Sequence, residues 1–128
     1  MGGVGQGAHD MEKKHEKTKE QRIKQENTRL RGIYKELDEN KKKIILPLIQ
    51  KAAFMHVELE DLQEHIAEHG ITEEYQNGEN QHGRKRSPEA DVYIALTKNY
   101  TAIIKQLTEL APAAKRKKSK LELLREED

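Results

Sequence analysis

The sequence predicts an all-α protein: an antiparallel helical hairpin with an additional N-terminal helix. Two long stretches carry apolar residues at alternating spacings of three and four, and one polar, glycine-containing connection joins them. The composition adds a third observation, since only 34% of the 128 residues are hydrophobic and 37% are charged. One copy can therefore bury little apolar surface against the entropy cost of ordering. This predicts that part of the chain is disordered and that copies bury apolar surface against one another in a homo-oligomer.

The first helix is expected over residues 18–39. Four of its apolar residues fall at positions i, i+3, i+4 and i+7 of one helical stripe: Leu30, Ile33, Tyr34 and Leu37. A break near residues 40–46 is expected next, because Asn40 can cap a helix and Pro47 prefers the first helical turn.

The second and third helices are expected over residues 46–69 and 88–110. Each carries a heptad-like seam, and the two seams consist of Leu48, Ala52, Met55, Leu59, Leu62 and Ile66, and of Tyr93, Leu96, Tyr100, Ile103, Leu107 and Leu110. Gly70 ends the second helix, and Ser87-Pro88-Glu89 supplies a cap, a first-turn proline and a first-turn acid for the third.

The connection over residues 71–86 is polar. Its Asn77-Gly78 pair is typical of a two-residue hairpin turn, so a short β-hairpin is one interpretation. Only Ile71 and Tyr75 could give such strands an apolar face. A mobile loop is therefore the interpretation that the sequence favours.

Charge divides the chain into three parts: a disordered basic arm over residues 1–17, a helical oligomerisation domain over 18–112, and a basic then acidic tail over 113–128. Residues 52–83 hold eight acids and no Lys or Arg, whereas 114–120 read AKRKKSK. Clustered cations bind polyanions, although solvated helix faces are the alternative for 11–31. The candidate DNA-binding residues are Lys13, Lys14, Lys17, Lys19, Arg22, Lys24, Arg29, Arg31, Lys115, Arg116, Lys117, Lys118 and Lys120.

Several apolar residues lie beside the seams and exceed what a three-helix monomer of this polarity needs. They are candidates for contacts between subunits. These candidate interface residues are Ile49, Phe54, Val57, Ile94 and Ile104.

Catalytic patterns are sparse, and the sequence predicts no enzyme, no cofactor and no metal site. There is no cysteine, no phosphate-binding G-x-x-x-x-G-K-[ST] loop and no G-x-S-x-G elbow. His65-Ile66-Ala67-Glu68-His69 matches the H-x-x-E-H pattern of some metalloproteases, so a metal-dependent hydrolase using His65, Glu68 and His69 is one hypothesis. The pattern ends at Gly70, however, where a helix frays, and solvated residues at a helix end are the favoured interpretation.

Aromatic residues are also few, and three of the five lie on or beside the apolar seams. They leave no platform on which single-stranded bases could stack. Any nucleic acid is therefore expected to be a duplex bound through its backbone.

Several segments resemble small terminase subunits of tailed phages of Gram-positive bacteria. Residues 25–38 are similar to the first helix of that family, and residues 48–55 and 59–62 to the helix that follows. The most specific similarity is the stretch over residues 98–107 of the third expected helix, which opens with Lys98-Asn99-Tyr100; Arg84-Lys85-Arg86-Ser87-Pro88 precede that helix or open it. Two features depart from the family: the position of Pro47, and the lack of a recognisable helix-turn-helix at the N-terminus.

The resemblance implies a ring-forming protein of the host cytoplasm that binds double-stranded phage DNA at the packaging start. It would recruit and regulate the large terminase subunit, which carries the ATPase and nuclease. No apolar run approaches the roughly 18–20 residues that span a bilayer, so no membrane association is expected. The alternative from a different class is a coiled-coil adaptor or scaffolding protein that binds no DNA.

Overall fold

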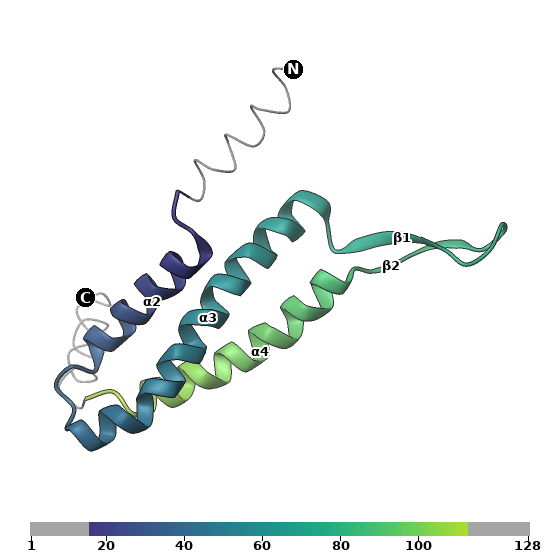
Figure 1. Cartoon of the computed structure of the whole chain (residues 1–128). Coiled ribbons are helices and arrows are strands. Elements are labelled where there is room, and N and C mark those ends of the chain that lie inside the picture. The colour runs from purple at the N-terminus through teal and green to yellow at the C-terminus, as the bar shows by residue number, and fades with distance from the viewer. Residues whose placement is uncertain (1–15, 113–128) are drawn as a thin grey trace, which may run out of the picture.

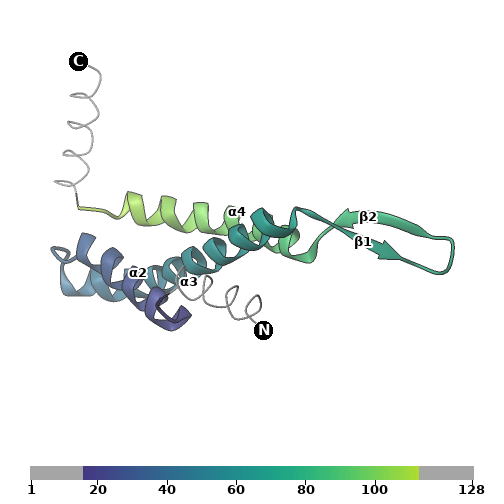
Figure 2. The ribbon, with the colours of Figure 1, turned by 90° about the horizontal axis from the view of Figure 1, so that it is seen from above.

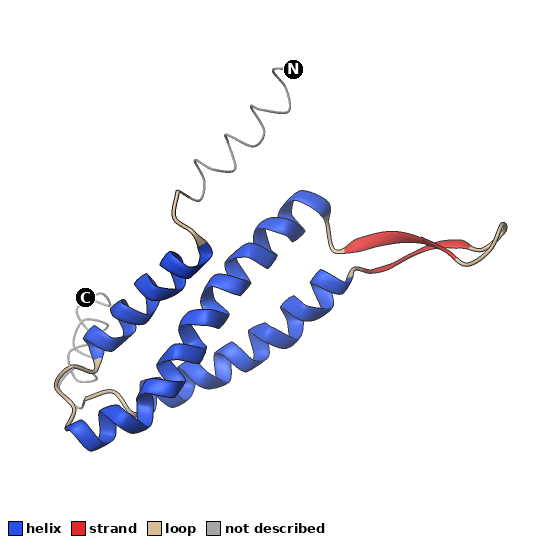
Figure 3. Ribbon diagram, viewed as in Figure 1, coloured by secondary structure: helices blue, strands red, loops and turns tan. Residues whose placement is uncertain are grey.

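The computed structural model describes residues 16–112, which form three helices and one two-stranded sheet (Figure 1 and Figure 3). Along the chain these are α2 (Lys19–Ile33), α3 (Glu39–His69), β1 (Thr72–Gln76), β2 (His82–Arg86) and α4 (Pro88–Glu109). The predicted, mostly helical fold class is confirmed. Helix α3 packs against both α2 and α4, and the β-hairpin projects beyond the ends of the helices (Figure 1 and Figure 2).

Helix α2 is shorter than the sequence predicts. It begins with a capping box, in which the Thr18 side chain accepts from the Gln21 N–H and the Gln21 side chain accepts from the Thr18 N–H. It ends at Ile33 rather than at residue 39, because the chain turns at Tyr34 to pack that side chain inward. Tyr34 is 5% exposed, and its hydroxyl donates a hydrogen bond to the Leu107 carbonyl of α4.

Helix α3 begins earlier than the sequence predicts. Asp38 caps it by accepting from the Lys41 N–H at 2.8 Å, and the helix runs through Pro47 without ending. The expected break over residues 40–46 is therefore wrong. Pro47 removes one backbone hydrogen bond, but it lies on the exposed side of a helix that buries Ile45 and Ile49 on its other side, where tertiary packing holds the backbone helical.

The two seams meet as expected. All six α3 seam residues are buried or half-buried, as are those of α4 except Leu110, which is exposed. Helices α3 and α4 are antiparallel, since the Ser87 N–H donates to the Ile71 carbonyl at one end while Tyr34 joins the α2–α3 turn to Leu107 at the other. Ser87 caps α4 by accepting from the Ala90 N–H at 3.2 Å.

The connection is a β-hairpin rather than the favoured mobile loop. Five residue pairs align antiparallel from Thr72↔Arg86 to Gln76↔His82, and residues 77–81 form the loop in place of a two-residue turn. Contacts between side chains of the two strands stabilise this hairpin in place of an apolar face. Glu73 lies 3.6 Å from Lys85. The Tyr75 ring covers Gly83 so closely that a Cβ at position 83 would lie 2.8 Å from a ring atom.

The core lies where all three helices meet, at the end of the molecule that carries the α2–α3 turn. Its buried side chains are Leu30, Tyr34, Ile45, Ile49, Ala52 and Leu107. No helix within residues 16–112 is both long and apolar enough to cross a membrane. The β-hairpin end holds no comparable cluster, so the core end is the best-packed part of the described chain.

Candidate nucleic-acid interface

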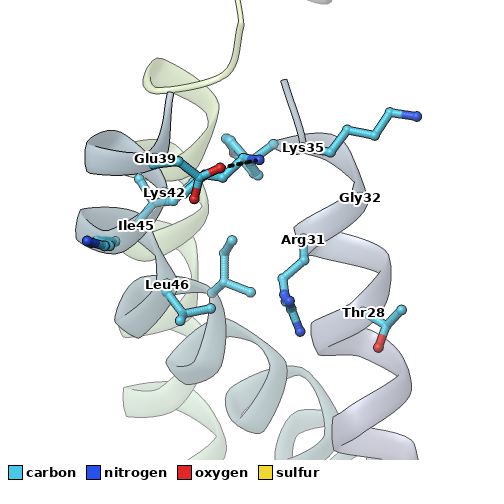
Figure 4. A pocket seen from close by; sticks show the side chains of 11 residues that line it. Thr28, Arg31, Gly32, Lys35, Glu39, Lys42, Ile45 and Leu46 are labelled. Carbon is cyan, nitrogen blue, oxygen red and sulfur yellow. Dashed lines mark hydrogen bonds and ion pairs between the residues drawn. The ribbon is translucent and has the colours of Figure 1, made fainter. Parts of the chain in front are cut away.

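A basic pocket, defined here as the cavity of about 500 Å³ between the end of α2 and the start of α3, lies at the core end of the molecule. Its rim carries four cationic side chains and one acid: Arg31, Lys35, Lys42, Lys43 and Glu39. Arg31 extends between the two helices, and Lys35 reaches outward from the end of α2 (Figure 4). The floor is apolar and includes Ile45, Leu46 and Ile49.

The local sequence explains why these cations gather. Because α2 ends at Ile33 and Asp38 caps α3 a few residues later, Arg31 and Lys35 close one helix while Lys42 and Lys43 open the next. Lys42 lies 3.5 Å from Glu39, an exposed i,i+3 contact that leaves the ammonium accessible. Arg31, Lys35 and Lys43 are exposed, so the pocket mouth carries accessible positive charge.

Three of the predicted DNA-binding residues are instead engaged with acids of the same chain. Lys19 forms ion pairs with Glu58 and Asp61 of α3, and Arg22 donates to Asp61 at 2.7 Å while its side chain is only 14% exposed. Arg29 binds Glu26 through its Nε at 3.0 and 3.1 Å. These contacts neutralise the cations against carboxylates, so they add little positive potential for a polyanion.

The remaining predicted DNA-binding residues fall into two groups. Lys17, Lys24 and Arg31 are exposed, and the Lys17 ammonium donates to the Gln25 side chain at 2.7 Å. The others lie outside the described residues: Lys13, Lys14, Lys115, Arg116, Lys117, Lys118 and Lys120.

Sequence reasoning missed Lys35, Lys42 and Lys43. Residues 40–43 read NKKK, so the run was visible, but the expected break at 40–46 placed it in a connection without neighbours. Helix α2 ends at Ile33 and α3 begins at Glu39, so the run lies beside Arg31, and only the fold reveals this.

A polar network ties the three helices together behind the pocket. His56 of α3 lies 3.3 Å from the Tyr100 hydroxyl of α4 and 4.0 Å from Glu26 of α2, which is only 9% exposed. The hydrogen bond that Arg29 donates to Glu26 raises the pKa of Arg29, and burial raises the pKa values of Tyr34 and Tyr100.

The histidine pair at the end of α3 does not assemble a metal centre in the described part of the chain. The rings of His65 and His69 lie 4.5 Å apart, and His65 also lies 3.9 Å from Glu89 of α4. Residues 16–112 contain no group of three or more His, Cys, Asp or Glu side chains placed to hold a metal ion. The hydrolase hypothesis thus finds no third ligand there.

The candidate interface residues divide by burial. Ile49 and Val57 are 2% and 1% exposed, so the chain's own helices already cover them and they have no surface to offer a second subunit. Ile104 is half-buried against the core. Phe54 and Ile94 remain outside, 51% and 53% exposed. Ile49 is covered because it packs in one cluster with Leu30 and Tyr34 at the end of α2 and with Leu107 of α4.

Comparison with known proteins adds no identification: no protein-family model, curated protein or solved structure matches this chain.

Proposed function

We propose that this chain is a non-enzymatic protein that binds double-stranded DNA through the basic pocket rim and the basic residues 115–120. The single observation that supports this is the sorting of charge. Lys19 and Arg22 near the start of α2 are paired with acids of α3, whereas Arg31, Lys35, Lys42 and Lys43 line one pocket together with a single acid, Glu39. Phosphate contacts of this kind bind duplexes of any sequence.

The position of the end of α4 also supports the proposed DNA-binding surface. Ala111 packs against the core cluster beside the α2–α3 turn, and Pro112 is the last described residue. The five cations of residues 115–120 therefore follow the end of α4 that packs on the core, and not the end that joins the β-hairpin. Two groups of cations that are far apart in sequence thus start from one end of the fold.

The resemblance to small terminase subunits extends this proposal. On that basis the chain binds phage DNA at the packaging start as a ring and brings in the large terminase subunit. The adaptor alternative is favoured by a different observation, the exposed apolar side chains Phe54 and Ile94. A measurement of duplex binding separates the two, because an adaptor needs no phosphate contacts.

We expect the Lys35→Gln/Lys43→Gln variant to bind duplex DNA more weakly and with a shallower salt dependence. Each lost phosphate contact lowers the slope of log K against log salt concentration by about 1, so the double variant should lose about 2. Fluorescence anisotropy of a labelled duplex over a salt series measures this slope.

The matched control for that measurement is Arg84→Gln/Lys85→Gln, which removes the same charge from the β-hairpin at the far end of the molecule. Its slope should equal that of the wild type. If both variants lost the same amount of slope, net charge alone would govern binding. If the wild type showed no salt-dependent binding to the duplex, the adaptor alternative would be favoured.

The exposed apolar side chains lead to a separate prediction about assembly. Phe54→Asp is expected to dissociate the oligomer, because an unpaired charge in an apolar interface costs several kcal/mol. Light scattering after size exclusion, at micromolar protein concentration, measures the particle mass. Gln76→Asp, which adds the same charge to the exposed hairpin, should leave the mass unchanged, and a monomeric wild type would contradict the oligomer.

A further inference from the structure

The basic pocket has a feature that DNA binding does not use, namely its apolar floor. Leu46 is 38% exposed at the cavity, above the buried Ile45 and Ile49. A phosphate backbone gains nothing from such a surface, whereas a ligand with apolar side chains between carboxylates would use both floor and rim. The chemistry of the pocket therefore matches an acidic, leucine-containing peptide.

One segment of the chain has this chemistry. Residues 121–128 read LELLREED, with three leucines, four acids and a single Arg. The pocket rim holds the opposite set, four cations and a single acid. The acidic stretch over residues 58–64 has a similar composition, but it is already paired with Lys19 and Arg22.

The path of the chain places this segment close to the pocket. Tyr34 lines the cavity, and its hydroxyl also donates to the Leu107 carbonyl, so the end of α4 and the pocket lie on either side of one side chain. Residues 113–120 separate Pro112 from Leu121, and eight extended residues reach at most about 26–29 Å. A tether of this length keeps the segment at high effective concentration near the pocket.

We propose that residues 121–128 dock in the basic pocket of their own chain, with leucines on the floor around Leu46 and carboxylates on the rim. The docked segment neutralises Arg31, Lys35 and Lys43 and so competes with any other polyanion for them. This autoinhibitory contact goes beyond the proposed DNA binding. The segment would dock in the pocket whether or not the chain binds DNA.

Disulfide trapping in the full chain tests the contact directly, because the protein has no natural cysteine. The Leu46→Cys/Leu123→Cys variant, oxidised with copper–phenanthroline at low protein concentration, should form an intramolecular disulfide. Ile94 is exposed and lies in the first third of α4, the part that follows the β-hairpin in the chain, so Ile94→Cys/Leu123→Cys is the control. The pocket pair should cross-link about tenfold faster or more.

The covalent tether alone could bring the two cysteines together. A third variant therefore distinguishes the effect of the tether from the effect of docking. Adding Lys35→Glu and Lys43→Glu to the pocket pair leaves the tether unchanged but reverses the rim charge. Both lysines are exposed, so the fold is retained. Docking predicts that the rate falls to that of the Ile94 control. An unchanged rate would overturn the proposal, as would disulfides formed only between chains, which would identify a second copy as the occupant.

A separate measurement of DNA binding tests whether the docked segment competes with DNA. Glu122→Gln/Glu126→Gln/Glu127→Gln should lower the apparent Kd for a duplex by about three- to tenfold, because the competent, undocked fraction rises. If neither protein binds DNA while rim-dependent cross-linking persists, the proposed function fails and the docking stands. If the triple variant binds DNA as the wild type does, the docked segment does not compete for the rim and the autoinhibitory contact is rejected.

Discussion

Replacing Ile49 by alanine is expected to lower the free energy of unfolding by about 2–5 kcal/mol, the range for deleting a large aliphatic side chain from a packed core. Ile49 is 2% exposed and belongs to a cluster supplied by all three helices, including Tyr34 and Leu107. The substitution therefore leaves a cavity where α2, α3 and α4 meet. Urea unfolding followed by far-ultraviolet circular dichroism measures the change.

Ile44→Ala is the matched control on the same helix. The same atoms are removed from a side chain that is 69% exposed, so stability should change by no more than about 0.5 kcal/mol. If the two variants lost equal stability, the core would not lie on the face of α3 that carries Ile49. A chain with so few apolar residues depends strongly on each buried one, which makes the contrast large.

Asp61→Ala is expected to lower the free energy of unfolding by about 1–3 kcal/mol, the range for a buried group left without its hydrogen-bond partner. Asp61 accepts from Arg22 Nη1 at 2.7 Å, and the Arg22 side chain is 14% exposed. Glu60 lies 3.7 Å from the other terminal nitrogen of Arg22 and compensates only in part. The same unfolding measurement applies, and added salt should change the result less than for an exposed pair, because the Arg22 side chain is mostly buried.

The control for Asp61 is Glu74→Ala in the β-hairpin. Glu74 lies 3.5 Å from Arg84, but the two side chains are 85% and 59% exposed, so solvent screens the pair and stability should not change measurably. A double-mutant cycle with Arg22→Ala isolates the coupling between Arg22 and Asp61. A coupling near zero would show that the first half of α2 is not held to α3 by this pair.

The distribution of charge connects these stability effects with the proposed function. The formal net charge is only +1, yet the acids of α3 hold the first half of α2 while the α2–α3 turn keeps its cations exposed. Breaking the contact between Arg22 and Asp61 would expose one cation and one acid together, so the net charge of that region would not change. Stability and the proposed DNA binding therefore depend on different cations, the first on Lys19 and Arg22 of α2 and the second on the cations around the α2–α3 turn.

The sequence by itself determined the features that depend on neighbours within a few residues. The seam spacings and the Ser87-Pro88 cap predicted α4 over 88–110 against an observed Pro88–Glu109, and Gly70 marked the end of α3. Such signals are local, since helix faces and caps involve side chains one turn apart. The antiparallel pairing of the two seams followed from them.

Only the tertiary structure decided the rest. The burial of Tyr34 against Leu107 ends α2 early, and the packing of Ile45 and Ile49 carries α3 through Pro47. Cross-strand charge pairs and the Tyr75–Gly83 contact order a connection that has almost no apolar face. Arg22 and Asp61 are distant in sequence, so no local pattern shows that this cation is paired while Arg31 stays exposed. The partners of a charged side chain depend on which helix faces meet, and long-range packing sets those faces.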